Sequence, residues 1–178
     1  MIDVLKSSRV RGMVASAAIL CLCGLAVAQP ANNACPSAIP VADGSVSGTT
    51  VGATNDGAGT CGASSSAPDV WYRYIAPVSG TLNVQTCGGA GWDTVLGIWS
   101  ACPQSGGNEM ACNDDNCWLQ SSVTAPIQEN VEYWIRVSGY SGATGAFSLT
   151  IQSTQVSGGG SNGADVVYTD FPSVSRYG

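Results

Sequence analysis

A short acidic segment between Cys112 and Cys117, the acidic loop, carries the residues best suited to chemistry. It reads Ala-Cys-Asn-Asp-Asp-Asn-Cys-Trp and sets four oxygen-bearing side chains in a row, Asn113 to Asn116, between two cysteines. Calcium takes about six to eight oxygen ligands, so this segment needs help from elsewhere in the chain, and Asp69 is one candidate. Asn and Asp are also common turn formers whose side chains bond nearby backbone amides, and that alternative stays open.

Tryptophans offer a second kind of site, a stacking surface for sugars. The chain has five of them: Trp71, Trp92, Trp99, Trp118 and Trp134. Large aromatic side chains in a small domain are more often core residues. Trp118 directly follows the acidic segment and Trp134 lies on the polar face of its expected strand. We therefore expect these two to be exposed and to contact a ligand such as a glycan.

Residue types on which many enzymes rely are missing. The chain has no histidine, and its single lysine is Lys6. A Ser-His or Cys-His pair and an imidazole metal ligand are therefore excluded. We expect no enzyme. A hydrolase with a carboxylate pair is the alternative, and replacing Asp114 and Asp115 by asparagine tests it, because turnover should fall while the fold persists.

The first 28 residues have the pattern of a secretory signal peptide. Lys6, Arg9 and Arg11 precede an uncharged apolar run, Met13–Ala28, that ends in Ala-Val-Ala. The run is shorter than the roughly 20 residues that a spanning helix needs. We expect cleavage after Ala28 and a secreted protein, extracellular or periplasmic, with no membrane attachment afterwards.

The remaining chain is strongly acidic. It keeps three arginines against eleven acidic residues, a net charge of −8. Nucleic acids and anionic membranes both require a basic face, so neither is expected as a partner. Calcium is the natural extracellular cation for such a surface, and no other cofactor is expected. The partner is expected to be an extracellular protein or polysaccharide.

An even number of cysteines remains, which is typical of a disulfide framework in an exported domain. They are Cys35, Cys61, Cys87, Cys102, Cys112 and Cys117. Sequence alone does not choose among the pairings, although chain order suggests Cys35–Cys61, Cys87–Cys102 and Cys112–Cys117. A zinc site is disfavoured because histidine and cysteine pairs with C-x2-C spacing are absent.

Short apolar runs separated by Gly, Ser and Thr predict an all-β, antiparallel two-sheet sandwich. We expect strands at 38–42, 46–51, 69–76, 80–86, 92–99, 109–112, 121–124, 130–137 and 146–152. Residues 78–80 and 141–145 resemble hairpin turns. Apolar residues alternate in the last two strands, so each should have one buried and one solvated face, with Arg136 on the solvated one. Arg73 and Arg136 should pair with a carboxylate such as Asp69 or Glu132, or stack on a tryptophan.

The composition changes after Thr154. Residues 155–163 form a Gly/Ser-rich linker, and 164–178 regain apolar residues but are too short to fold alone. The expected organisation is a signal peptide (1–28), a β-sandwich domain (29–154), the linker, and a tail or the start of a truncated second module (164–178).

Several segments in order resemble the bacterial pre-peptidase C-terminal domain, in a cysteine-rich secreted variant. They are DVWYRYIAP, TLNVQTCG, WDTVLGIWSAC, ACNDDNC and YWIRVSGYSGATGAFSLTI, within about 33–152. The resemblance implies a jelly-roll-like sandwich that is not an enzyme and is associated with substrate binding, secretion or adhesion. Related collagen-binding modules use calcium. It also places Asp93 on a strand before the acidic loop, so Asp93, Asn113, Asp114 and Asp115 become the expected calcium ligands.

The sequence as a whole predicts a non-catalytic extracellular accessory or binding module of a larger secreted bacterial protein. Its ligand is expected to be a protein or a glycan, with calcium assisting. The alternative is a structural spacer or surface-layer component with no ligand site. An array of glycans and proteins separates the two, because a spacer should bind nothing.

Overall fold

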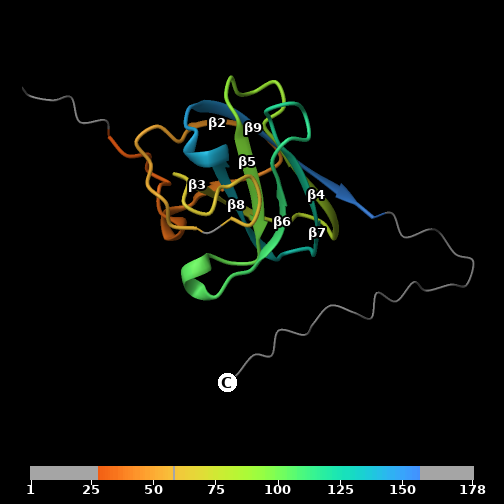
Figure 1. The fold of residues 1–178 in the computed structure, drawn as a ribbon. Coiled ribbons are helices and arrows are strands. Elements are labelled where there is room, and N and C mark those ends of the chain that lie inside the picture. Colours follow the sequence, from red (N-terminus) through yellow and green to blue (C-terminus); the bar gives the residue numbers. More distant parts are fainter. Residues whose placement is uncertain (1–27, 58, 157–178) are drawn as a thin grey trace, which may run out of the picture.

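The structure is a computed structural model that describes residues 28–57 and 59–156 (Figure 1). These residues form nine strands: β1 (Ile39–Val41), β2 (Gly44–Thr49), β3 (Val70–Ile75), β4 (Gly80–Gln85), β5 (Thr94–Trp99), β6 (Glu109–Asn113), β7 (Ser122–Ile127), β8 (Glu132–Gly139) and β9 (Ala146–Gln155). Three short 3-10 turns accompany them: η1 (Cys35–Ser37), η2 (Pro103–Ser105) and η3 (Tyr140–Gly142). The predicted signal peptide, apart from Ala28, and the tail lie outside the described residues, as does nearly all of the linker. Within the described ranges, no helix has the length and apolar character to cross a membrane.

The strands form two sheets, which confirms the predicted all-β sandwich. Sheet A has the order β1-β3-β8-β5-β6, and sheet B has the order β2-β9-β4-β7. Every pairing is antiparallel except that of β1 with β3, which is parallel. Each predicted strand is present within a few residues of its expected bounds. Short apolar runs separated by turn-forming residues therefore predicted the fold class correctly.

The two segments predicted as hairpin turns connect different sheets, so that prediction was wrong. The segment at 78–80 joins β3 of sheet A to β4 of sheet B, and 141–145 joins β8 of sheet A to β9 of sheet B. A turn-forming composition marks the end of a strand, but it does not tell whether the next strand pairs with it or crosses to the facing sheet.

The main core lies between the sheets and follows the period-two pattern. On β8 the inward residues are Tyr133, Ile135 and Val137, and on β9 they are Phe147, Leu149 and Ile151, all of them buried. Burying such side chains contributes about 1.5–3 kcal/mol each to folding. This interior fixes the registers of β8 and β9, because a shift of one residue would turn their apolar sets outward.

The outer face of sheet A is covered around Arg136, contrary to the prediction of a solvated face along β8. Arg136 does point away from the main core, but it is only 1% exposed. Its guanidinium donates to Asp69, to the hydroxyl groups of Ser64 and Ser138, and to the carbonyl of Ser64. The segment between β2 and β3 supplies most of these partners, so it folds over this face. Its Gly- and Ser-rich sequence has no periodic pattern from which that packing could be predicted.

Both arginines of the sandwich pair with carboxylates, as predicted. Arg73 Nη1 lies 2.7 Å from Glu132 Oε1 at the surface, and Arg136 Nε lies 2.8 Å from Asp69 Oδ2 in the interior. Trp71 Nε1 donates to Asp69 Oδ1 at 3.1 Å, and the Trp71 ring packs edge-on against that of Trp99, with 5.8 Å between the ring centroids. Asp69 is therefore part of the fold's interior and is not a helper for the acidic loop.

The six cysteines form three disulfides, but the pairing suggested by chain order was wrong. The bonds are Cys35–Cys102, Cys61–Cys112 and Cys87–Cys117, with sequence separations of 67, 51 and 30 residues. In chain order, the first cysteine is bonded to the fourth, the second to the fifth and the third to the sixth. Cys112 and Cys117 flank the acidic loop, and each ties it to a separate segment of the chain.

Candidate functional site

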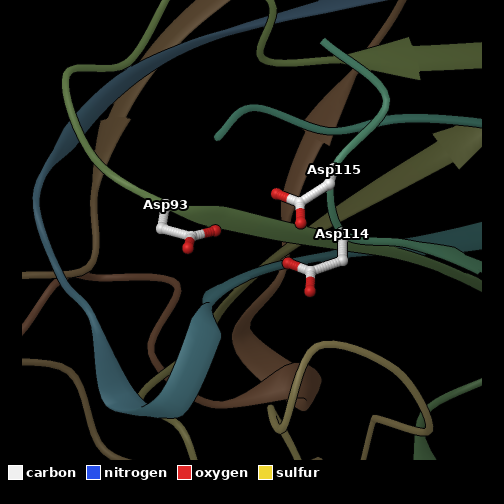
Figure 2. A group of neighbouring side chains, drawn as sticks. All are labelled: Asp93, Asp114 and Asp115. Atoms are coloured by element: carbon white, nitrogen blue, oxygen red, sulfur yellow. The ribbon is translucent and has the colours of Figure 1, made fainter. Parts of the chain in front are cut away.

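Two neighbouring strands bring three carboxylates together (Figure 2). Asp93 directly precedes β5, and Asp114 and Asp115 directly follow β6. Because β5 and β6 are antiparallel, with Leu96 opposite Asn113, the start of one strand lies beside the end of the other. One carboxylate oxygen from each aspartate lies within 4.8 Å of the others. We refer to Asp93, Asp114 and Asp115 as the acidic cluster.

Two oxygens of the acidic cluster lack the partners that buried oxygens normally have. Among the described residues, Asp93 Oδ1 and Asp114 Oδ1 are buried without a hydrogen bond. Burial raises the pKa of Asp93, and the charge of Asp115 raises it further. Burial also raises the pKa of Asp114, with smaller contributions from Asp115 and Asp93. A cation would pair with these oxygens and relieve the repulsion, so the donor set fits a hard cation such as Ca²⁺.

A glycine closes one side of the acidic cluster. Gly62 has a φ of +61°, and a Cβ atom there would lie 2.9 Å from Asp114 Oδ1 and 2.5 Å from Val95 Cγ2. The adjoining Cys61 is bonded to Cys112 at the end of β6. The disulfide thus holds the Gly62 segment against Asp114, and only glycine combines that close approach with a positive φ.

Three buried hydroxyl groups anchor the base of the acidic loop. Thr86 Oγ1 and Thr94 Oγ1 are 2.6 Å apart, and Ser121 N donates to Thr94 Oγ1 at 3.1 Å. The Ser121 hydroxyl lies within hydrogen-bonding reach of the carbonyls of Thr94 and Asp114. These contacts fix Asp114 relative to the start of β5. Sequence analysis missed all three residues, because Thr and Ser at strand ends carry no distinguishing signal.

Asn113, predicted as a calcium ligand, has a turn-forming role in the structure. Its Oδ1 accepts from the backbone N–H of Asn116 at 3.2 Å and from that of Ser122 at 3.0 Å. These bonds close the loop that presents Asp114 and Asp115. The turn-forming alternative weighed for this segment therefore describes Asn113, while the three aspartates form the acidic cluster.

Trp118 is displayed at the tip of the same loop. Its side chain is 91% exposed, and the neighbouring Leu119 is 53% exposed. Trp118 has a φ of +66°, a conformation that costs free energy for a residue other than glycine. The backbone on either side is held by the Cys87–Cys117 disulfide and by a 2.9 Å hydrogen bond from Thr94 N to Leu119 O. The exposure predicted for Trp118 is therefore present, on a fixed support.

Trp134 lies elsewhere and is only partly exposed. It pairs with Trp99 across β8 and β5, near the opposite end of β5 from Asp93. It packs against the cluster that contains Trp71 and lines a groove with Arg73 and Glu132. The structure therefore does not join Trp118 and Trp134 into one surface, although both were predicted to contact a ligand.

Comparison with known families gives one assignment. Residues 31–151 match the model of a T9SS-associated family described as galactose binding domain-like. No curated protein matches the chain. The family is a β-sandwich family, in agreement with the fold above. Its members are typically non-catalytic. The match covers more than half of the chain and includes every strand up to the middle of β9. The chain therefore belongs to the galactose binding domain-like family associated with T9SS.

Proposed function

We propose that this chain is an exported, non-catalytic binding module in which a calcium ion stabilises the loop that carries Trp118. The observation that carries the proposal is the pair of buried, unpartnered oxygens on Asp93 and Asp114, with the Asp115 carboxylate beside them. Buried acceptors without donors are costly, so an arrangement that retains two of them beside a third carboxylate favours a bound cation.

The geometry favours calcium over magnesium. Three carboxylates fall short of the roughly six to eight oxygens that calcium takes, and Asp115 is exposed, so the remaining positions face solvent. Ca²⁺ tolerates irregular coordination of this kind, whereas Mg²⁺ demands near-ideal octahedral geometry. Under this proposal, oxygens of a ligand that contacts Trp118 would fill some of these solvent-facing positions.

Export and an accessory role rest on several independent features. The predicted signal peptide, the three disulfides and the T9SS association of the family all favour a secreted or cell-surface protein. The resemblance to pre-peptidase C-terminal domains favours attachment to a larger secreted bacterial protein. A glycan or a protein is the expected ligand, and the family's description makes glycans the first class to test.

A ligand array tests this function. The chain without residues 1–28 is applied to immobilised glycans and extracellular proteins in calcium and in chelator. We expect binding in calcium that weakens at least tenfold in chelator, in the Trp118→Ala variant, and in the Asp114→Asn/Asp115→Asn variant. Val156→Ala is the control. Val156 is also exposed, at 67%, but it lies beside Ser79, at the end of sheet B opposite to the acidic loop.

The outcome also decides between a binding module and a spacer. If the wild-type chain binds nothing on the array in calcium, the spacer alternative is supported and the proposed function fails. If binding persists unchanged in Trp118→Ala, the ligand contacts another surface and the role of Trp118 is wrong.

A further inference from the structure

A groove lies on the outer face of sheet A, away from the acidic cluster. It has a volume of about 420 Å³ and is lined mainly by Cys35, Pro36, Arg73, Cys102, Glu132 and Trp134. Trp134 lies opposite Trp99 at the end of β5, whereas Asp93 precedes its start. Six residues of strand span roughly 20 Å, so the groove is separate from the acidic cluster.

Three side chains form a compact platform in this groove. Arg73 and Trp134 are direct cross-strand partners on β3 and β8, and Glu132 precedes Trp134 by two residues and shares its face. Arg73 Nη1 donates to Glu132 Oε1 at 2.7 Å, and the two side chains remain 39% and 40% exposed. A guanidinium has five N–H donors and a carboxylate two acceptor oxygens, so much of their hydrogen-bonding capacity is open to the groove.

Packed residues and a disulfide support the platform. Trp134 packs against the buried cluster of Trp71 and Trp99. The Cys35–Cys102 disulfide joins η1 to the start of η2 and forms one wall. A ligand would therefore meet a surface that is already organised, which reduces the entropic cost of binding.

The chemistry of the groove selects a neutral ligand with both hydroxyl groups and an apolar face. The charges of Arg73 and Glu132 cancel, and the pair presents donors and acceptors side by side, next to the flat indole of Trp134. β3 and β8 are interior strands of sheet A, so their backbone groups are already paired and the groove cannot accept a peptide as an added strand. On β3 and β8, only side chains remain to recognise the ligand.

We propose that this groove binds a pyranose unit of a neutral saccharide, which stacks on Trp134 and hydrogen-bonds to Arg73 and Glu132. A pyranose ring has neighbouring hydroxyl groups on its rim and an apolar C–H face, which suits the electron-rich face of an indole. The site goes beyond the proposed function: it requires neither calcium nor Trp118.

The test uses methyl pyranosides of glucose, galactose, mannose and N-acetylglucosamine as probes. Saturation-transfer NMR and tryptophan fluorescence are measured on the chain without residues 1–28. At least one probe is expected to bind with millimolar affinity, equally in calcium and in chelator. Arg73→Gln and Glu132→Ala are each expected to weaken binding at least fivefold, and Trp134→Ala at least tenfold. The first two should leave the fold intact, because an exposed ion pair contributes little to stability.

Trp118→Ala is the matched control and should leave pyranoside binding unchanged, so failure of the calcium-linked function and failure of this groove are distinguishable. The proposal is overturned if no probe binds, or if Arg73→Gln and Glu132→Ala bind as well as the wild type. It is also overturned if the chain self-associates through the groove, seen as a concentration-dependent mass in sedimentation that Trp134→Ala or Glu132→Ala abolishes.

Discussion

Replacement of Arg136 by methionine is expected to lower the free energy of unfolding by about 3–5 kcal/mol. The variant keeps most of the side-chain volume but leaves the Asp69 carboxylate buried without its counter-charge. Asp69 Oδ2 is 2.8 Å from Arg136 Nε, and both side chains are almost fully buried. The carbonyl of Ser64 also loses its donor, at 2.8 Å from Arg136 Nη2. The ion pair joins the segment between β2 and β3 to sheet A, so this segment should loosen first.

Urea unfolding at several pH values checks this expectation. Burial raises the pKa of Asp69 from 3.8 to about 6, although Arg136 lowers it. Since the folded-state pKa exceeds the unfolded value, the folded protein holds an extra proton between about pH 6 and 4. The contribution of Asp69 to the unfolding free energy therefore increases as the pH falls through that window. Without Arg136 this pH dependence should begin at higher pH, because the pKa of Asp69 rises further, and it should extend over a wider pH range.

Glu132→Gln is the matched control for the loss of an ion pair. The Arg73–Glu132 pair has a similar distance but is about two-fifths exposed, so its removal should cost less than about 1 kcal/mol. If Arg136→Met and Glu132→Gln lower the unfolding free energy equally, the buried pair does not hold the covering segment as described.

Removal of the Cys35–Cys102 disulfide is expected to have an effect of similar size. Replacing both cysteines by alanine should lower the unfolding free energy by about 4–5 kcal/mol. The bond joins residues 67 positions apart, which constrains the unfolded chain strongly. Both cysteines are also buried beside Trp71 and Trp99, so small cavities add to the cost.

The Cys87–Cys117 disulfide is the matched comparison for the loss of Cys35–Cys102. Its separation of 30 residues predicts a smaller loss of about 3.5 kcal/mol when both cysteines are replaced by alanine. However, this bond holds the loop of Trp118, so its removal should weaken calcium binding, while removal of Cys35–Cys102 should not. Both pairs are compared by urea unfolding and calcium titration under oxidising conditions. Equal effects of the two removals on calcium binding would contradict the assignment of the acidic loop.

Local patterns were sufficient to predict the strands, because each strand has its own apolar set and is bounded by turn-forming residues. The disulfide pairing could not be predicted, since it depends on which strands cross between sheets. Arg136 illustrates the same limit. Alternation correctly placed it on the face opposite Ile135, but whether that face meets water depends on residues 50–69, whose sequence has no periodicity.

Only part of the acidic cluster could be predicted from the sequence. Asp114 and Asp115 stand out by residue type, and the family resemblance added Asp93. Gly62 packs against Asp114, and Thr94 and Ser121 hold the base of the acidic loop. These contacts join segments that are distant in sequence, so no local pattern predicts them. Asn113 could not be separated from the aspartates, because the same residue types serve as turn formers and as calcium ligands.

Calcium calorimetry tests the central claim most directly. The chain without residues 1–28, freed of metal, is titrated with calcium chloride at pH 7.4. We expect one ion per chain, a higher melting temperature in calcium, and loss of both effects in the Asp114→Asn/Asp115→Asn variant. Both effects should also fade toward pH 4, because protons compete for the carboxylates of Asp93 and Asp114, whose pKa values are raised. No heat and no melting shift at millimolar calcium, with the chain folded, would contradict a calcium-stabilised binding loop.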